Sequence, residues 1–232
     1  MSRLKEWKHV ILFVALICLS FSQSLAPDRT PLLPILHDVL ITITLMVALF
    51  VVFESHVERY VALVAAAVSV GCSFLRYFLP AYEGVALGVA HDAALALFFG
   101  YAAVEILRNI FRRRTIRADD VVGSVCGYLL AGAAWASLYS LVGYLVSDSF
   151  AIEPSLHAEL GGWHSRHALF DYFSFVTLTT MGYGDVTPIR SPATMLAWLE
   201  AIFGQFYIAV VVAQLVAVRL TQSPHPGNPG TG

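Results

Sequence analysis

Charged side chains are scarce in this chain, and their scarcity excludes an ordinary soluble domain. Only 13% of the 232 residues are Asp, Glu, Lys or Arg, whereas 58% are hydrophobic. A soluble globular domain carries roughly 25% charged residues. The mean hydropathy of +0.71 supports the same conclusion. The sequence therefore predicts a membrane protein. In such a protein the length of the chain limits the number of membrane-spanning helices and does not indicate a number of soluble domains.

Other features are also missing. The formal net charge is -2 and long basic runs are absent, so nothing favours nucleic acid as a partner. The three cysteines, Cys18, Cys72 and Cys126, lie in apolar runs. Cysteine behaves there as a small hydrophobe, and we expect no disulfide framework. No nucleotide-binding, phosphate-cradling or hydrolase motif occurs. We therefore expect neither an enzyme nor a bound cofactor.

The chain contains many apolar stretches that are about long enough to cross a membrane. About 20 apolar residues in a helix cross the hydrocarbon core of a bilayer. We expect an all-α membrane protein with six transmembrane helices, at 10–25, 35–53, 60–79, 85–107, 121–146 and 195–220. These divide into a four-helix N-terminal domain at 1–117 and a pore domain at 118–220. A tail rich in Pro and Gly at 221–232 is expected to be disordered.

The first apolar run, 10–25, admits two interpretations. It is short for a span and ends in Ser24-Leu25-Ala26, which resembles a signal-peptide cleavage site. A basic start followed by a first span is equally the plan of an uncleaved membrane protein, and we favour the retained helix. In both cases the second helix begins outside.

Lysine and arginine predict the orientation in the membrane, because these residues are enriched in cytoplasmic loops. With the N-terminus inside, ten lie on the cytoplasmic side and four outside. The cytoplasmic group is Arg3, Lys5, Lys8, Arg59, Arg108, Arg112, Arg113, Arg114, Arg117 and Arg219, and the outer group is Arg29, Arg76, Arg166 and Arg190. We expect a multi-pass protein of the plasma (inner) membrane with both termini in the cytoplasm.

The segment 168–179 is too short to span a membrane, and Pro188 and Pro192 separate it from the last apolar run. A non-spanning element at membrane depth is tolerated only where protein buries it or where it lines water. We therefore predict a re-entrant pore helix and loop that enters from the outer face, between helices five and six.

The loop that follows has the composition of an ion filter. Gly182 and Gly184 flank Tyr183, so the backbone can take positive φ at alternate positions without a Cβ penalty. Such alternation aims successive carbonyls to one side, where they can replace the hydration shell of a cation. The hydroxyl of Thr180 adds one more oxygen.

The run Thr180-Met181-Gly182-Tyr183-Gly184 resembles the signature of potassium channels, usually Thr-Val-Gly-Tyr-Gly, with Met181 in place of valine. The resemblance covers about 168–185 for the pore helix and filter, and 121–220 for the pore. It implies that K⁺ is coordinated by the carbonyls of Thr180, Met181, Gly182 and Tyr183 and by the Thr180 hydroxyl. It also implies a homotetramer, because one strand cannot surround an ion.

Four polar or small residues near the filter are further candidates for function. Asp185 is expected at the outer mouth, where it concentrates cations, or in a hydrogen bond to an aromatic residue of the pore helix. Glu200 is expected to brace the back of the filter or the pore helix. Gly204 is either a gating hinge, as in potassium channels, or a site of tight packing. Gln205 is expected to face the cavity.

The fourth span, 85–107, lacks the charges of a voltage sensor. Steep voltage gating needs 3 to 4 basic charges per subunit, and this span has no Arg or Lys but contains His91, Asp92 and Glu105. We expect weak or no voltage gating. The arginines at 108–117 are interpreted as a cytoplasmic anchor, and Arg76 is expected to pair with Asp92 or Glu83.

Three function classes remain in view. His164 and His167 have a metal-compatible spacing, but exposed loop histidines are usually solvated, and the eight histidines can lend pH sensitivity. The favoured function is a tetrameric potassium channel in contact with membrane lipid. A cation transporter subunit is the alternative, although related transporters carry several degenerate pore loops per chain. A non-conducting membrane sensor or scaffold is the third.

Overall fold

The computed structural model describes residues 7–24, 32–78, 85–112, 115, 117–157 and 163–222. In this part of the chain the secondary structure is almost entirely helical. The elements are α2 (Lys8–Ser24), α3 (Leu32–Val51), α4 (His56–Phe78), α5 (Val85–Arg112), α6 (Ala118–Leu145), β1 (Phe150–Ile152), α7 (Pro154–His157), α8 (Trp163–Leu178), β2 (Val186–Pro188) and α9 (Ser191–Gln222).

Five of the described helices, α3, α4, α5, α6 and α9, are long and apolar enough to cross a membrane. The predicted first span corresponds to α2, whose apolar part, Lys8–Ser22, is shorter. The chain is thus a multi-pass helical membrane protein, and its described residues include five helices of spanning length and one shorter apolar helix. The predicted tail lies outside the described residues except for its first two, which continue α9.

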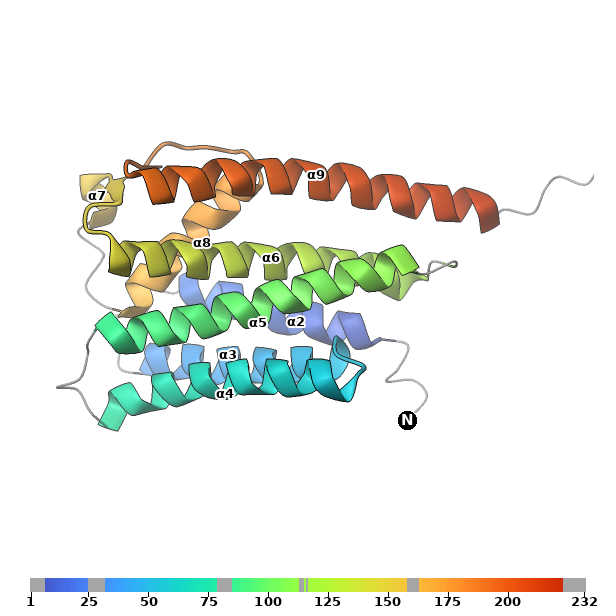
Figure 1. Ribbon diagram of the computed structural model, residues 1–232, viewed down its shortest axis with the longest axis horizontal. Coiled ribbons are helices and arrows are strands. Elements are labelled where there is room, and N and C mark those ends of the chain that lie inside the picture. Colours follow the sequence, from blue (N-terminus) through green and yellow to red (C-terminus); the bar gives the residue numbers. More distant parts are fainter. Residues whose placement is uncertain are drawn as a thin grey trace, which may run out of the picture.

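The long helices run side by side (Figure 1), with α6 between the N-terminal helices and the C-terminal part of the chain. α6 packs against α5 and α2 on one side and against α8 and α9 on the other. Small residues on α6 permit this close approach. A Cβ at Gly127, for example, would come within 2.6 Å of the Tyr207 hydroxyl and 3.2 Å of the Ile106 side chain.

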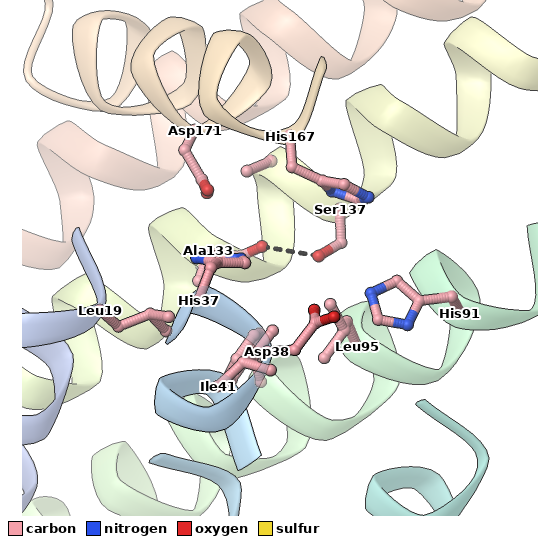
Figure 2. A pocket seen from close by; sticks show the side chains of 12 residues that line it. Leu19, His37, Asp38, Ile41, His91, Leu95, Ala133, Ser137, His167 and Asp171 are labelled. Atoms are coloured by element: carbon pink, nitrogen blue, oxygen red, sulfur yellow. Dashed lines mark hydrogen bonds between the residues drawn. The ribbon is translucent and has the colours of Figure 1, made fainter. Parts of the chain in front are cut away.

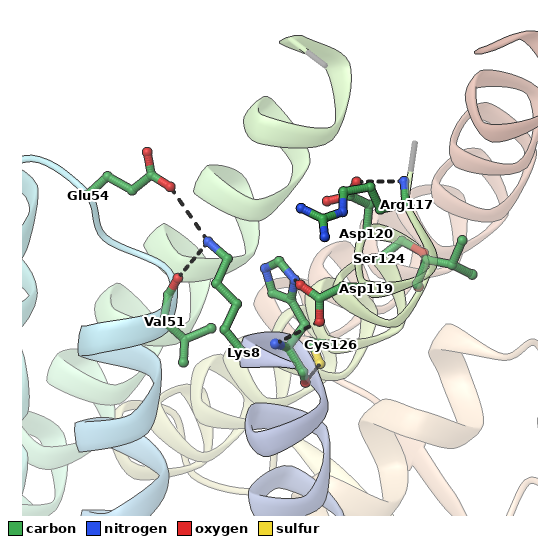
Figure 3. A network of polar contacts seen from close by, with 10 residues as sticks. Lys8, Val51, Glu54, Arg117, Asp119, Asp120, Ser124 and Cys126 are labelled. Carbon is green, nitrogen blue, oxygen red and sulfur yellow. Dashed lines mark hydrogen bonds and ion pairs between the residues drawn. The ribbon is translucent and has the colours of Figure 1, made fainter. Parts of the chain in front are cut away.

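Helix α2 packs one face against α3 and α6. Leu12 and Leu16 are buried to 0% and 3% exposure. At its N-terminal end, the Nδ1 atom of His9 lies 2.7 Å from an Asp119 carboxylate oxygen of α6, and the Lys8 ammonium lies 3.6 Å from Glu54 (Figure 3). This packing favours a retained helix over a cleaved signal peptide.

The residues between the predicted fifth helix and the predicted pore helix, 147–167, include structure that the sequence did not reveal. β1 pairs with β2 in an antiparallel ribbon, with Ala151 opposite Thr187. α8 also begins at Trp163, five residues before the predicted start of the pore helix. Residues 179–185 therefore lie between two hydrogen-bonded elements, the helix α8 and the ribbon of β1 and β2.

Candidate functional site

The predicted filter lies between α8 and α9. α8 has 16 residues and ends at Leu178. The chain then reverses and runs back beside α9 to the start of that helix (Figure 1). This course brings residues 179–185 alongside α9 and leaves most of their surface uncovered by the rest of the chain.

The backbone of this segment alternates in handedness. Thr180, Gly182 and Gly184 have φ angles of 59°, 58° and 82°. Left-handed conformations are free of steric cost for glycine but uncommon for other residues. The sequence predicted the two glycine positions and missed Thr180. Three positive φ values at every second residue create the alternation that can aim successive carbonyl groups in one direction.

The inner end of the segment is hydrogen-bonded to α8. The Thr180 amide donates to the Thr177 carbonyl at 2.9 Å, and the Met181 amide donates to the Val176 carbonyl at 2.9 Å. The Tyr128 hydroxyl of α6 donates to the Leu178 carbonyl at 3.0 Å. The turn from helix to filter is therefore held by both backbone and side-chain bonds.

The outer end is held through Asp185. Its carboxylate accepts hydrogen bonds from the Tyr172 hydroxyl of α8 at 2.5 Å and from the Val186 amide at 2.9 Å. The Asp185 carbonyl accepts from the Glu153 amide at 2.9 Å. Of the two roles considered for Asp185, the hydrogen bond to an aromatic residue of the pore helix is present.

Glu200 lies behind α8, as expected for a bracing residue. It is fully buried on α9. Its carboxylate accepts hydrogen bonds from the Tyr139 hydroxyl of α6 and the Ser174 hydroxyl of α8, both at 2.5 Å. Buried carboxylates are tolerated when such donors compensate for lost hydration. One side chain thus joins three helices around the filter.

Gly204 and Gln205 face the junction of α8 and the filter. A Cβ at Gly204 would overlap the Leu178 carbonyl oxygen. This close approach favours the packing role over the hinge. The Gln205 amide nitrogen lies 3.4 Å from the Thr180 hydroxyl oxygen, and both residues are exposed on the single chain.

The expectation of a solvated loop around His167 is wrong. His167 does not lie in a solvated loop: it is part of α8, its side chain is 12% exposed, and its Nε2 atom lies 3.5 Å from Asp92 of α5. Arg76 forms an ion pair with Asp38 at 3.7 Å, and its charge also acts on Asp92, one of its two expected partners. Glu83, its other expected partner, lies outside the described residues. Sequence periodicity could not reveal these partners, because each contact joins different helices.

Residues 136–220 match the protein-family model described as Ion channel. The match begins within α6 and extends through the filter to α9. Comparison with curated proteins gave no match. The matched region supports ion channel function, in agreement with the site's position.

Proposed function

We propose that the chain is a subunit of a homotetrameric, potassium-selective channel. Four copies of residues 180–184 surround the fourfold axis, and K⁺ passes down its gradient between the carbonyls of Thr180, Met181, Gly182 and Tyr183. Gly184 completes the outer end of the filter. The alternating positive φ of this segment carries the proposal.

Exposure on the single chain supports a filter shared among subunits. Met181 and Tyr183 retain 56% and 66% of their accessible surface. Backbone carbonyls that strip a cation must face it from several sides, and one strand offers one side only. Assembly around an axis supplies the remaining sides.

The other site residues have supporting roles in this proposal. Asp185 sets the outer end of the filter through Tyr172, and Glu200 holds α8 in place. Gln205 faces the inner cavity. The protein resides in the plasma (inner) membrane with both termini in the cytoplasm, so the filter opens toward the outside.

Flux into liposomes tests the proposal. Purified protein is reconstituted with a K⁺ gradient and a voltage-sensitive dye, with Na⁺ or a coupled ion tested separately. We expect K⁺ flux that needs no second ion. Flux that requires a coupled ion indicates the transporter, and absent flux indicates a silent scaffold; either result contradicts the channel.

Two glycine variants test the proposed filter, one within it and one elsewhere as the matched control. Gly182→Ala places a Cβ at a φ of 58° and should abolish selectivity, because L-residues resist this conformation. Gly71→Ala on α4, where a Cβ meets no atom within 4 Å, should leave flux unchanged. Equal selectivity for K⁺ over Na⁺ in both variants would argue against residues 180–184 as the filter.

The proposed channel has weak or no intrinsic voltage dependence. No Lys or Arg occurs in α5 before Arg108, which lies 3.3 Å from Glu105 near the end of that helix. Each gating charge contributes about 2.3 kcal/mol per 100 mV, and α5 has none at its centre. A steep conductance–voltage relation without internal blocking ions would contradict this.

A further inference from the structure

Three metal-ligating side chains meet between α5 and α8, away from the filter. His91 and Asp92 of α5 are 3% and 0% exposed. One potential ligand atom from each of these residues and from His167 of α8 lies within 4.8 Å of the others. The rings of His91 and His167 have centroids 5.5 Å apart. The three potential ligand atoms are therefore close enough together to share one ion.

We propose that His91, Asp92 and His167 bind a divalent transition-metal ion of the Zn²⁺ class. Two imidazole nitrogens and one carboxylate oxygen form a recognised zinc ligand set, with a water as the fourth ligand. The site would join the N-terminal helices to α8. It is independent of ion conduction, because it requires only the contact between α5 and α8.

The surroundings of His91 prepare it as a ligand. Its Nδ1 atom lies 3.1 Å from the Ser69 backbone carbonyl oxygen of α4. The Ser69 and Ser73 hydroxyl oxygens lie 3.3 and 3.5 Å from the same atom, and these contacts hold the imidazole ring in place. When Nδ1 donates to the carbonyl oxygen, Nε2 keeps its lone pair for a metal. A metal-binding histidine typically donates its second nitrogen to such a partner.

Asp92 is the residue of the cluster that a bound cation would stabilise most. It is a completely buried carboxylate, and neither oxygen has a hydrogen-bond partner of good geometry among the described residues. The His167 Nε2 atom lies 3.5 Å from an Asp92 carboxylate oxygen, the Ser140 hydroxyl interacts with this carboxylate, and the positive charges of Arg166 and Arg76 also act on it. Buried carboxylates are normally paired or bound to metal.

A small cavity beside the cluster can hold the fourth ligand. Its volume is about 30 Å³, and His91 and His167 line it. About 10–15 Å³ is enough for one water. Asp38 and Asp171 direct their carboxylates into the same cavity (Figure 2), which makes the environment more favourable for a cation. Arg76, paired with Asp38, opposes this in part.

The cluster lies within reach of water on the proposed outer side. Asp92 is seven residues from the start of α5 at Val85. At 1.5 Å per residue this is a depth of about 10 Å. A metal ion can therefore enter from outside without crossing the full membrane.

Metal binding is measured on the full chain, purified in detergent without a polyhistidine tag and stripped with a chelator. Zn²⁺ is titrated in competition with a chromophoric chelator, and Co²⁺ is added separately as a spectroscopic probe. We expect one Zn²⁺ per chain and the intense visible absorption of four-coordinate Co²⁺. Absence of both in the unsubstituted protein overturns the proposal and leaves the cluster as an ion-pair network.

Variants then locate the ion. Asp92→Asn and His167→Ala should weaken Zn²⁺ affinity at least about tenfold, because each removes a ligand. His56→Ala, at an exposed position at the start of α4, should bind as the unsubstituted protein does. Elution volume on size exclusion identifies misfolded variants. The Co²⁺ spectrum is recorded on the unsubstituted protein, so that measurement still tests the proposal if a variant misfolds. Equal affinity in folded Asp92→Asn protein overturns the proposal.

Discussion

Contact between Gly204 and the end of α8 is the tightest packing feature near the filter. A Cβ there would overlap the Leu178 carbonyl oxygen, which also accepts from the Tyr128 hydroxyl. Both α6 and α9 thus reach the residue from which the filter begins. At the residue scale, the geometry of the filter depends on how closely these helices approach.

Gly204→Ala is expected to destabilise the protein, because the added methyl group meets backbone that cannot move aside. Overpacking of this kind costs about 1–3 kcal/mol. Thermal unfolding in detergent measures the effect, with Gly71→Ala as the matched control, since its Cβ meets no atom within 4 Å. Stability equal to the control with altered open probability would favour the hinge instead.

Tyr172→Phe is expected to reduce selectivity for K⁺ over Na⁺. Burial and the hydrogen bond to Asp185 raise the pKa of Tyr172 to about 12, so its hydroxyl remains a donor at neutral pH. Its loss frees one carboxylate oxygen at the outer end of the filter. Reversal potentials in mixed K⁺ and Na⁺ measure the change.

The control for this variant is Tyr60→Phe, at an exposed position on α4. Reversal potentials identical in the two variants would show that the Tyr172 hydroxyl does not support the filter.

At the scale of elements, Glu200 connects α6, α8 and α9. Glu200→Ala leaves the buried Tyr139 hydroxyl without its acceptor, whereas the Ser174 hydroxyl keeps the Gly132 carbonyl oxygen at 2.8 Å. An unsatisfied buried polar group costs about 1–3 kcal/mol. We expect a lower unfolding temperature for Glu200→Ala, and a smaller decrease for Glu200→Gln because the amide keeps an acceptor oxygen.

Glu153→Gln, at an exposed position, is the matched control and should be neutral. If Glu200→Ala unfolded at the same temperature as this control, the three-helix connection would not contribute to stability.

Helix α2 is expected to remain in the mature protein. Its buried leucines and the contact of His9 with Asp119 connect it to α6. Removing it would expose apolar surface worth about 1.5–3 kcal/mol per leucine. Intact mass spectrometry of protein purified from membranes tests this. A mass lacking the first 26 residues would identify a signal peptide instead.

At the scale of the whole molecule, a single chain forms only part of the proposed channel. The filter segment and large apolar residues of α9, such as Trp198 and Phe206, are exposed. Lipid can cover an apolar helix face, but it cannot satisfy backbone carbonyls of the filter. Other copies of the chain can cover both.

Native mass spectrometry in detergent should therefore give four times the 25.3 kDa chain. Membrane-permeable crosslinking before extraction controls for dissociation in detergent. A monomer or dimer under both conditions would contradict a fourfold pore.

The features that the sequence predicted depend on residues that are close together along the chain. Hydropathy depends on neighbouring residues, so the long helices were found, although their ends shifted. Glycine spacing is equally local, so the positive φ angles of Gly182 and Gly184 in the proposed filter were predicted. The ribbon of β1 and β2 was missed because each strand has three residues, too few for a pattern, and its partner lies more than thirty residues away.

The sequence by itself determined the membrane class, the filter motif and the absence of sensor charges, because each is a property of a continuous stretch. Only the tertiary structure decided which residues hold the filter and that Gly204 packs against Leu178. It also decided that His167 lies in α8, close to His91 and Asp92, and not in a loop. Those contacts join side chains from different helices, and their distances depend on packing that no single stretch encodes.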